Sequence, residues 1–240
     1  MLTGMRAGAS FLPSQPRRIS MAGEYIVHGA AGTGSVMVEA VLTLLDLPYR
    51  VVETSLFDTG DDPALAGVNP MRQVPALILP RGDLGGELMT ESSAILIWLA
   101  DEHPEARLAP TMASAQRPAF LRWMAFCSAA IYALFWIRDD PSRLTSHKEV
   151  QGEIKARTGD RIAECWGIMD AQVDPGRYIL GDELTVLEIA VTVMSRWSPR
   201  RRRFYEVAPK LSEVVRRVDA EPRLQAFWAS RFPFEEGWEG

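Results

Sequence analysis

The chain has 240 residues, 47% of them hydrophobic, and a formal net charge of −5. This length is enough for one large or two small domains with a sizeable core, so the fold needs no disulfide framework or structural metal. The net charge gives no overall attraction to nucleic acid or to an anionic membrane. The only two cysteines, Cys127 and Cys165, are too few for a disulfide framework and too far apart for a zinc site.

The first residues of the chain read as an unstructured leader. Residues 1–22 carry Pro13, Pro16, several serines and glycines, and scattered arginines. They contain no continuous apolar segment of the kind that a secretion signal needs, and no apolar run elsewhere approaches the length of a membrane span. We therefore predict a disordered leader over residues 1–22 and a cytoplasmic protein without membrane, nucleic-acid or metal partners.

Residues 23–104 have the order of elements of a small α/β domain. Strands are predicted over residues 25–28, 49–53, 75–79 and 87–89, with a glycine-rich turn over residues 82–86. Helices are predicted over residues 35–46 and 91–103, the second of which is ended by Pro104, and a short irregular helix within residues 58–70. The first strand, helix and strand imply a right-handed crossover and a parallel pair.

The rest of the chain changes character after a linker over residues 105–113. Residues 114–240 contain no convincing strand, and we predict helices over residues 115–138, 148–173, 185–196, 207–220 and 223–231. Residues 185–194 are apolar on nearly every face, which is typical of a central, buried helix. Thr185 and Glu188 have the spacing of a capping box, in which the threonine caps the helix and the glutamate reaches back.

Two short motifs of the first domain point to a ligand. Pro75 opens a predicted strand, and a cis bond after Val74 would turn the Val74 backbone outward, where it can pair with a peptide ligand. Glu91 and Ser92 open the following helix, whose free amides suit an α-carboxylate, while the Glu91 carboxylate suits an α-ammonium. Together they fit a short peptide with a free amino-acid end.

These motifs resemble those of the glutathione transferases in order and spacing from Glu24 to Pro233. The resemblance implies an α/β N-terminal domain of thioredoxin-like fold over residues 23–104 and an all-α C-terminal domain over residues 114–240. It further implies a homodimer and glutathione as co-substrate. The residues implied to bind glutathione are Gln73, Val74, Pro75, Glu91 and Ser92.

Two positions depart from the family pattern. Arg72 stands where a glycine is common, so we expect a different turn in that loop. Glu188 stands where the capping box usually has aspartate, which should weaken the cap only modestly.

The resemblance implies that the residue that activates the glutathione thiol, a Tyr, Ser or Cys, lies after the first strand or at the start of the first helix. That region reads Gly32-Thr33-Gly34-Ser35, with Gly34 in the place that cysteine-type bacterial enzymes use. Ser35 is therefore the first candidate and Thr33 the second, since a hydroxyl beside free amides at a helix N-terminus favours a thiolate. The alternative for Ser35 is a plain helix cap.

Two further groups of residues could have either a functional or a structural role. Tyr132 and Trp136 lie one turn apart and either line the hydrophobic substrate pocket or belong to the core. The run from Arg200 to Arg203 is expected to be a solvated or dimer-facing cluster rather than a nucleic-acid site.

The expected function is conjugation of the glutathione thiolate to small hydrophobic electrophiles, as in detoxification. The alternatives are a glutathione-dependent peroxidase or disulfide reductase on the same fold, and a non-catalytic binding protein. The absence of a cysteine at the start of the first helix disfavours exchange through a mixed disulfide with the protein.

Overall fold

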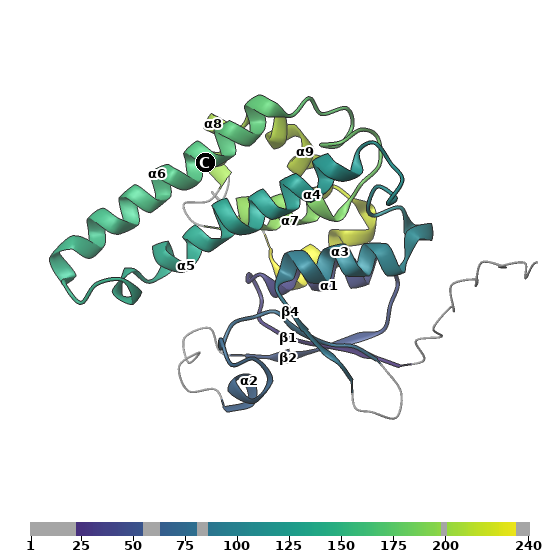
Figure 1. The fold of residues 1–240 in the computed structure, drawn as a ribbon, viewed down its shortest axis with the longest axis horizontal. Helices are drawn as coiled ribbons and strands as arrows, with labels where there is room; N and C mark the ends of the chain where they lie inside the picture. The colour runs from purple at the N-terminus through teal and green to yellow at the C-terminus, as the bar shows by residue number, and fades with distance from the viewer. Residues whose placement is uncertain (1–22, 55–62, 81–85, 198–200, 234–240) are drawn as a thin grey trace, which may run out of the picture.

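The computed structural model describes residues 23–54, 63–80, 86–197 and 201–233. The predicted leader, most of the predicted turn over residues 82–86, and Arg200 lie outside these residues. Within them the chain forms a small α/β layer with a larger set of helices stacked on it (Figure 1).

The first domain is built on a sheet of four strands in the order β2-β1-β3-β4. The strands are β1 (Tyr25–Gly29), β2 (Tyr49–Glu53), β3 (Ala76–Ile78) and β4 (Leu88–Thr90). β1 and β2 are parallel, as the predicted crossover requires, whereas β1–β3 and β3–β4 are antiparallel. This is the thioredoxin-like arrangement, and the prediction is confirmed.

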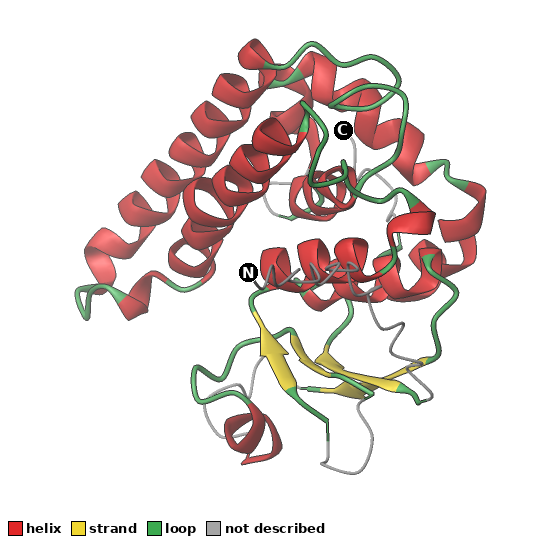
Figure 2. Cartoon of the chain, turned by 45° about the vertical axis from the view of Figure 1, so that its right-hand side comes forward, coloured by secondary structure: helices red, strands yellow, loops and turns green. Residues whose placement is uncertain are grey.

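Three helices accompany the sheet. They are α1 (Ser35–Leu44), α2 (Pro63–Val68) and α3 (Ser92–Glu102). α1 and α3 lie on the face of the sheet that meets the helical domain, and α2 lies on the other side (Figures 1 and 2). Every residue of α1 except Thr43 is buried, because the helix is covered by the sheet on one side and by the helical domain on the other.

The second domain is helical throughout its described part, as predicted. Its helices are α4 (Arg117–Phe126), α5 (Ala133–Asp139), α6 (Lys148–Gln172), α7 (Val186–Ser195), α8 (Arg201–Val207), α9 (Pro209–Asp219) and α10 (Gln225–Arg231). Short 3-10 turns, η1 (Pro104–Ala106), η3 (Pro141–Arg143) and η4 (Pro222–Leu224), join them. A π-helical segment, η2 (Cys127–Tyr132), joins α4 to α5 in one continuous helix. The π segment and α8 were not predicted.

The central helix α7 begins at the predicted capping box. The Thr185 hydroxyl accepts a hydrogen bond from the Leu187 amide, and the Glu188 carboxylate accepts from the Thr185 amide at 2.7 Å. Glu188 has no exposed surface, and it also accepts from the Ile179 amide at 2.9 Å. The longer side chain of Glu188 therefore completes the cap and adds a bond to the preceding loop.

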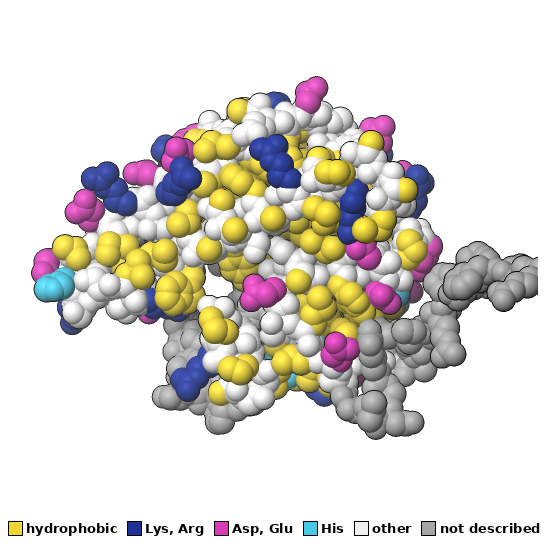
Figure 3. Space-filling model, viewed as in Figure 1, with side chains coloured by type: hydrophobic (Ala, Val, Ile, Leu, Met, Phe, Trp, Pro, Cys, Tyr) yellow, Lys and Arg dark blue, Asp and Glu magenta, His cyan; other side chains and the backbone are white. Residues whose placement is uncertain are grey.

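The helical run from α4 to α5 is more apolar than we expected from the sequence. Residues 117–139, from α4 to α5, are long and apolar enough to cross a membrane by length and composition, with a mean hydropathy of 1.6 over the best window. A core helix of a globular protein passes the same test, so a single such helix is weak support for a membrane span. Figure 3 shows apolar side chains along this run on the outer face of the molecule.

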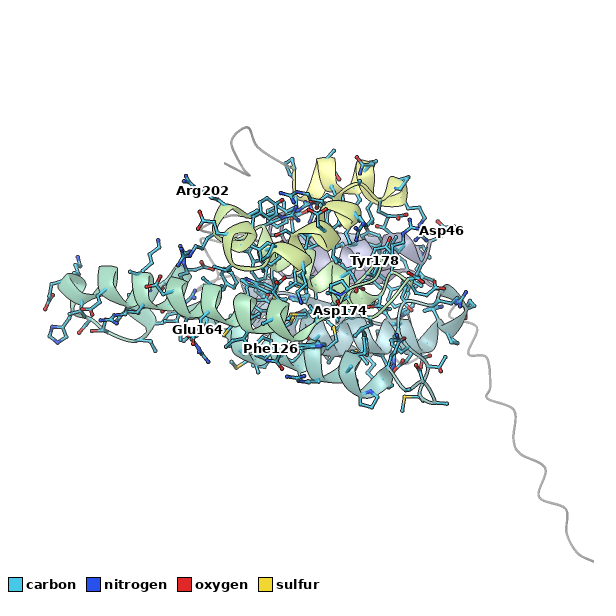
Figure 4. The ribbon with its side chains drawn as sticks, turned by 90° about the horizontal axis from the view of Figure 1, so that it is seen from above. Asp46, Phe126, Glu164, Asp174, Tyr178 and Arg202 are labelled. Carbon is cyan, nitrogen blue, oxygen red and sulfur yellow. The ribbon has the colours of Figure 1, made fainter. Side chains whose placement is uncertain are left out.

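The arginine run is not a solvated cluster, and that prediction is wrong for Arg201. Arg201 is fully buried and binds the Asp219 carboxylate, which Arg196 also binds at 2.6 Å. Arg202 and Arg203 are exposed and pair with Glu206 of the same helix, and Arg202 points away from the body of the protein (Figure 4). The buried pairing of α8 with α9 thus interrupts what reads in sequence as a single basic patch.

Candidate functional site

The loop before β3 presents the backbone of Val74 at the edge of the sheet. The Val74–Pro75 peptide is cis, as predicted, and Pro75 is buried while Gln73 is exposed. Asn69 holds this turn, because its amide nitrogen donates to the Gln73 carbonyl at 2.7 Å and its oxygen accepts from the Met71 amide at 3.0 Å. The described ladder with β1 begins at Ala76, so Val74 lies outside it.

The same loop contains Arg72, the position at which the family often has glycine. Arg72 has a φ of 53°, which is the left-handed conformation that glycine adopts most easily. The loop therefore holds Arg72 in a backbone conformation that a glycine at this position would adopt more easily.

Glu91 and Ser92 lie directly beside the Val74–Pro75 peptide. Ala76 pairs with Thr90 across the β3–β4 ladder, so the residues just before Ala76 and just after Thr90 share one edge of the domain. Ser92 is the first residue of α3 and is 5% exposed, whereas Glu91 is exposed. No side chain among the described residues caps α3, so the first amides of this helix are available to an anion.

The backbone of Glu91 is unusual. Its φ of 66° and ψ of 102° lie outside the regions that a glutamate ordinarily occupies. Such a conformation costs about 1–3 kcal/mol and is found where a site depends on it. Here it turns the chain from β4 into α3 and leaves the Glu91 carboxylate at the helix N-terminus.

The hydroxyls of Ser35 and Thr33 are both engaged within the loop after β1. Ser35 has no exposed surface, and its hydroxyl donates to Glu39 Oε1 at 2.8 Å and accepts from the Ala30 amide at 3.1 Å. The Thr33 hydroxyl donates to the Ala30 carbonyl at 2.7 Å and lies 3.0 Å from the Ser35 hydroxyl. A Cβ at Gly29 would lie 2.2 Å from Ser35 Oγ, so the serine is packed against the strand. This placement does not offer Ser35 to a ligand.

Tyr132 and Trp136 occupy different surroundings, although they lie one turn apart as predicted. The Tyr132 ring packs on Trp197 with centroids 4.8 Å apart, close to the first turn of α1. Trp136 is 41% exposed and lies under the Arg143 guanidinium. A small pocket in the helical domain contains neither of them. Its lining includes Phe135, Ile162, Trp166, Met194, Trp197 and Phe204.

The helical domain holds the α1 loop from the other side, which the sequence did not indicate. The Trp197 indole donates to the Gly32 carbonyl at 2.7 Å, and the Gly32 amide donates to the Arg231 carbonyl at 3.0 Å. The Arg231 guanidinium reaches the buried carboxylate of Glu39, with Nε 2.5 Å from Oε2. These contacts join residues up to 192 positions apart in the sequence. No pattern among neighbouring residues predicts them.

The two cysteines are packing residues rather than nucleophiles. Both are buried in the helical domain. Burial, together with the charge of Glu188, raises the pKa of the Cys127 thiol to about 12, and burial also raises that of Cys165. A thiol in such surroundings stays protonated and inert. Among the described residues, no group of three or more His, Cys, Asp or Glu side chains could hold a metal ion.

Comparison with known proteins agrees with this geometry. The family model described as glutathione S-transferase, N-terminal domain, matches residues 35–107. The uncharacterized GST-like protein YncG of Escherichia coli K12 is 30% identical over 201 residues, which cover 83% of this chain and 94% of YncG.

Solved structures of glutathione transferases have the same fold. A glutathione transferase homologue from Sulfitobacter, solved with bound glutathione, superposes with a TM-score of 0.75 at 21% identity, covering 85% of this chain and 96% of that one. BphK, a bacterial glutathione transferase solved as a ternary complex, superposes with a TM-score of 0.68 at 26% identity, covering 84% and 96%. From its sequence relatives and its fold, the chain belongs to the glutathione S-transferase family.

Proposed function

We propose that this protein is a glutathione transferase that conjugates the glutathione thiolate to small hydrophobic electrophiles. The observation that carries the proposal is the convergence of Val74, Glu91 and Ser92 at one edge of the sheet. A free backbone edge, a carboxylate and an uncapped helix N-terminus match the three parts of a γ-glutamyl peptide. The Sulfitobacter homologue, which has the same fold, was solved with glutathione bound.

Each of these residues has a distinct task in the proposed complex. The Glu91 carboxylate receives the α-ammonium, and Ser92 with the first amides of α3 receives the α-carboxylate. The Val74 backbone pairs with the cysteinyl residue, Pro75 fixes the direction of that backbone, and the exposed Gln73 side chain adds a polar contact. The thiol then lies toward the N-terminus of α1, whose dipole favours a thiolate.

The burial of both cysteines favours conjugation over disulfide exchange through a protein thiol. The chain has only Cys127 and Cys165, and both are buried in helices of the second domain, η2 and α6. A reductase that forms a mixed disulfide through its own thiol needs an exposed, acidic cysteine. A peroxidase that uses only the bound glutathione thiolate remains the second candidate, because it needs the same site.

We also propose a cytoplasmic homodimer. The outer face of the α4–α5 run carries exposed small and apolar side chains, here called the α4–α5 face: Leu121, Ala125, Ala129, Ala133 and Trp136. An exposed apolar stripe of this length on a helix is typical of a surface that meets another protein. A second copy of the chain is the partner proposed for it.

The test is a conjugation assay with an electrophile panel. Purified protein is incubated with glutathione and an activated aryl halide, an α,β-unsaturated carbonyl or an organic hydroperoxide. Thioether formation with the first two would support a transferase. Turnover of the hydroperoxide alone would support the peroxidase, and glutathione binding with no turnover of any compound would support a binding protein.

A further inference from the structure

A tyrosine of the helical domain stands where the first turn of α1 has no side chain. A Cβ added at Gly34 would lie 1.9 Å from the hydroxyl oxygen of Tyr132 and 2.8 Å from its Cζ. Gly34 directly precedes α1 and is its N-cap residue. The absence of a side chain at Gly34 therefore leaves the space into which the Tyr132 hydroxyl reaches from η2.

The Tyr132 hydroxyl is available for a ligand. No hydrogen bond joins it to any residue in the described part of the chain, although the ring is fixed against Trp197. Trp197 is itself anchored, because its indole donates to the Gly32 carbonyl two residues before Gly34. The phenol is thus held in place by its ring, while its oxygen remains without a partner from the protein.

The charges around Tyr132 keep it a donor. Burial raises the pKa of its phenol, and the negative charges of Glu91 and Asp139 raise it further. The Glu91 carboxylate, which is proposed to bind the α-ammonium of glutathione, is thus close enough to the Tyr132 hydroxyl to affect its pKa. A phenol that stays protonated at neutral pH can donate a hydrogen bond but does not act as a base.

Neither earlier hydroxyl candidate has this freedom. Ser35 donates to Glu39 and has no exposed surface, and Thr33 donates to the Ala30 carbonyl. Freeing either hydroxyl would break bonds that hold the loop between β1 and α1 together.

We propose that Tyr132 is the catalytic hydroxyl of this enzyme, donating a hydrogen bond to the glutathione sulfur over the Gly34 amide at the start of α1. This inference rests on the proposed function, since it needs glutathione in the site. The thiol proton leaves to solvent, the sulfur keeps the electron pair, and the phenol O–H donates to the resulting thiolate. No proton is transferred to Tyr132. The thiolate then forms the bond to the electrophilic carbon. With an aryl halide the carbon–halogen bond breaks and halide leaves with its electron pair; with an α,β-unsaturated carbonyl the π electrons move to the carbonyl oxygen, and a proton from solvent completes the addition.

The decisive experiment is an ultraviolet titration of the thiolate of bound glutathione in wild type, Tyr132→Phe and Ser35→Ala. Tyr132→Phe should raise the pKa of the bound thiol by about one to two units, as expected for losing a hydrogen bond to a charged acceptor. Conjugation at neutral pH should fall by about ten- to a hundredfold and recover at high pH. Ser35→Ala should lower thermal stability and leave the thiol pKa in place.

Gly34→Ala tests the geometry independently. The added methyl group would collide with the Tyr132 hydroxyl and displace it, so this variant should raise the thiol pKa as Tyr132→Phe does. In the double variant, Gly34→Ala should add little to the shift, because the hydroxyl is already gone. Circular dichroism confirms that each variant is folded.

The outcomes separate this inference from the proposed function. If wild-type protein does not bind glutathione, the proposed function fails. If wild type binds glutathione and lowers its thiol pKa, but Tyr132→Phe leaves that pKa unchanged, the role of Tyr132 is overturned. If only Ser35→Ala raises the pKa of the bound thiol, Ser35 and not Tyr132 donates the hydrogen bond to the glutathione sulfur.

Discussion

The carboxylate of Glu39 on α1 and the guanidinium of Arg231 on α10 form an ion pair between the two domains, with Nε 2.5 Å from Oε2. The Glu39 side chain has no exposed surface, and the Arg231 side chain is 18% exposed. Glu39 also accepts the Ser35 hydroxyl, and the Arg231 carbonyl accepts the Gly32 amide. The last described helix thus holds the loop that precedes α1 from two directions.

Breaking this pair should destabilise the protein strongly. Glu39→Gln leaves a guanidinium without its buried partner, and we expect a loss of about 3 kcal/mol in the free energy of unfolding, at the lower end of the range for buried pairs. The matched control is Glu53→Gln, because Glu53 also binds Arg231 but is 56% exposed, and it should cost less than about 1 kcal/mol. Urea unfolding of both variants measures the difference. Equal losses in the free energy of unfolding would show that burial does not make the Glu39 ion pair more stabilising than the exposed Glu53 pair.

The cap of α7 should make stability depend on pH. Burial raises the pKa of Glu188 above its ordinary value of 4.5, although hydrogen bonds from Thr185 and Ile179 oppose the shift. The folded protein then binds the proton more tightly than the unfolded chain does. The contribution of Glu188 is therefore fully present below its ordinary pKa and is lost as pH rises through the raised value.

Comparison with Glu188→Gln isolates this effect, because glutamine does not titrate. The stability advantage of wild type over Glu188→Gln should shrink as the pH rises above 4.5, the ordinary pKa of a glutamate. An advantage that grows as the pH rises would mean that the hydrogen bonds from Thr185 and Ile179 to the carboxylate lower its pKa instead. Thr185→Ala removes the other half of the cap and should cost about 1 kcal/mol at either pH.

Glycine should be more stable than alanine at position 72. Its φ of 53° is unfavourable for a residue with a Cβ. Arg72 has a further interaction, so the informative comparison is between Arg72→Gly and Arg72→Ala, which both lack the arginine side chain. We expect Arg72→Gly to be more stable than Arg72→Ala by about 0.5–1 kcal/mol in thermal unfolding. Equal stability would argue against the left-handed conformation.

The proposed dimer is tested by charge on the α4–α5 face. Wild-type protein should scatter light as a particle of twice the 26.7 kDa chain mass at micromolar concentration. Ala125→Glu places a carboxylate in the middle of this face and should yield the monomer. Val150→Glu, at an exposed apolar position on α6, is the control and should remain dimeric. A wild-type monomer at these concentrations would contradict the proposal.

Local patterns predicted most of the fold. The strand and helix order of the first domain, the parallel β1–β2 pair, the cis peptide after Val74 and the capping box at Thr185 were each visible in a few neighbouring residues. The structure also brings Val74 and Glu91 together as expected, because the short β3–β4 hairpin makes them neighbours.

Contacts between distant segments could not be predicted in this way. Arg201 reads as one of four surface arginines, yet Asp219 draws it into the core. Ser35 reads as a thiol-activating hydroxyl or a plain cap at a helix start, yet it is packed against Gly29 and its hydroxyl donates to Glu39. The approach of Tyr132 to Gly34 depends on how the two domains dock, and periodicity within one helix carries no information about that.

The most direct test of the account is calorimetric titration of glutathione into wild type, Glu91→Gln and Ser92→Ala, with Ser93→Ala as the matched control one residue further along α3. Wild type and Ser93→Ala should show saturable binding at one site per chain. Glu91→Gln and Ser92→Ala should each bind about tenfold or more weakly, as expected for losing a hydrogen bond to a charged group. No saturable binding by wild type, or unchanged affinity in both site variants, would contradict the account.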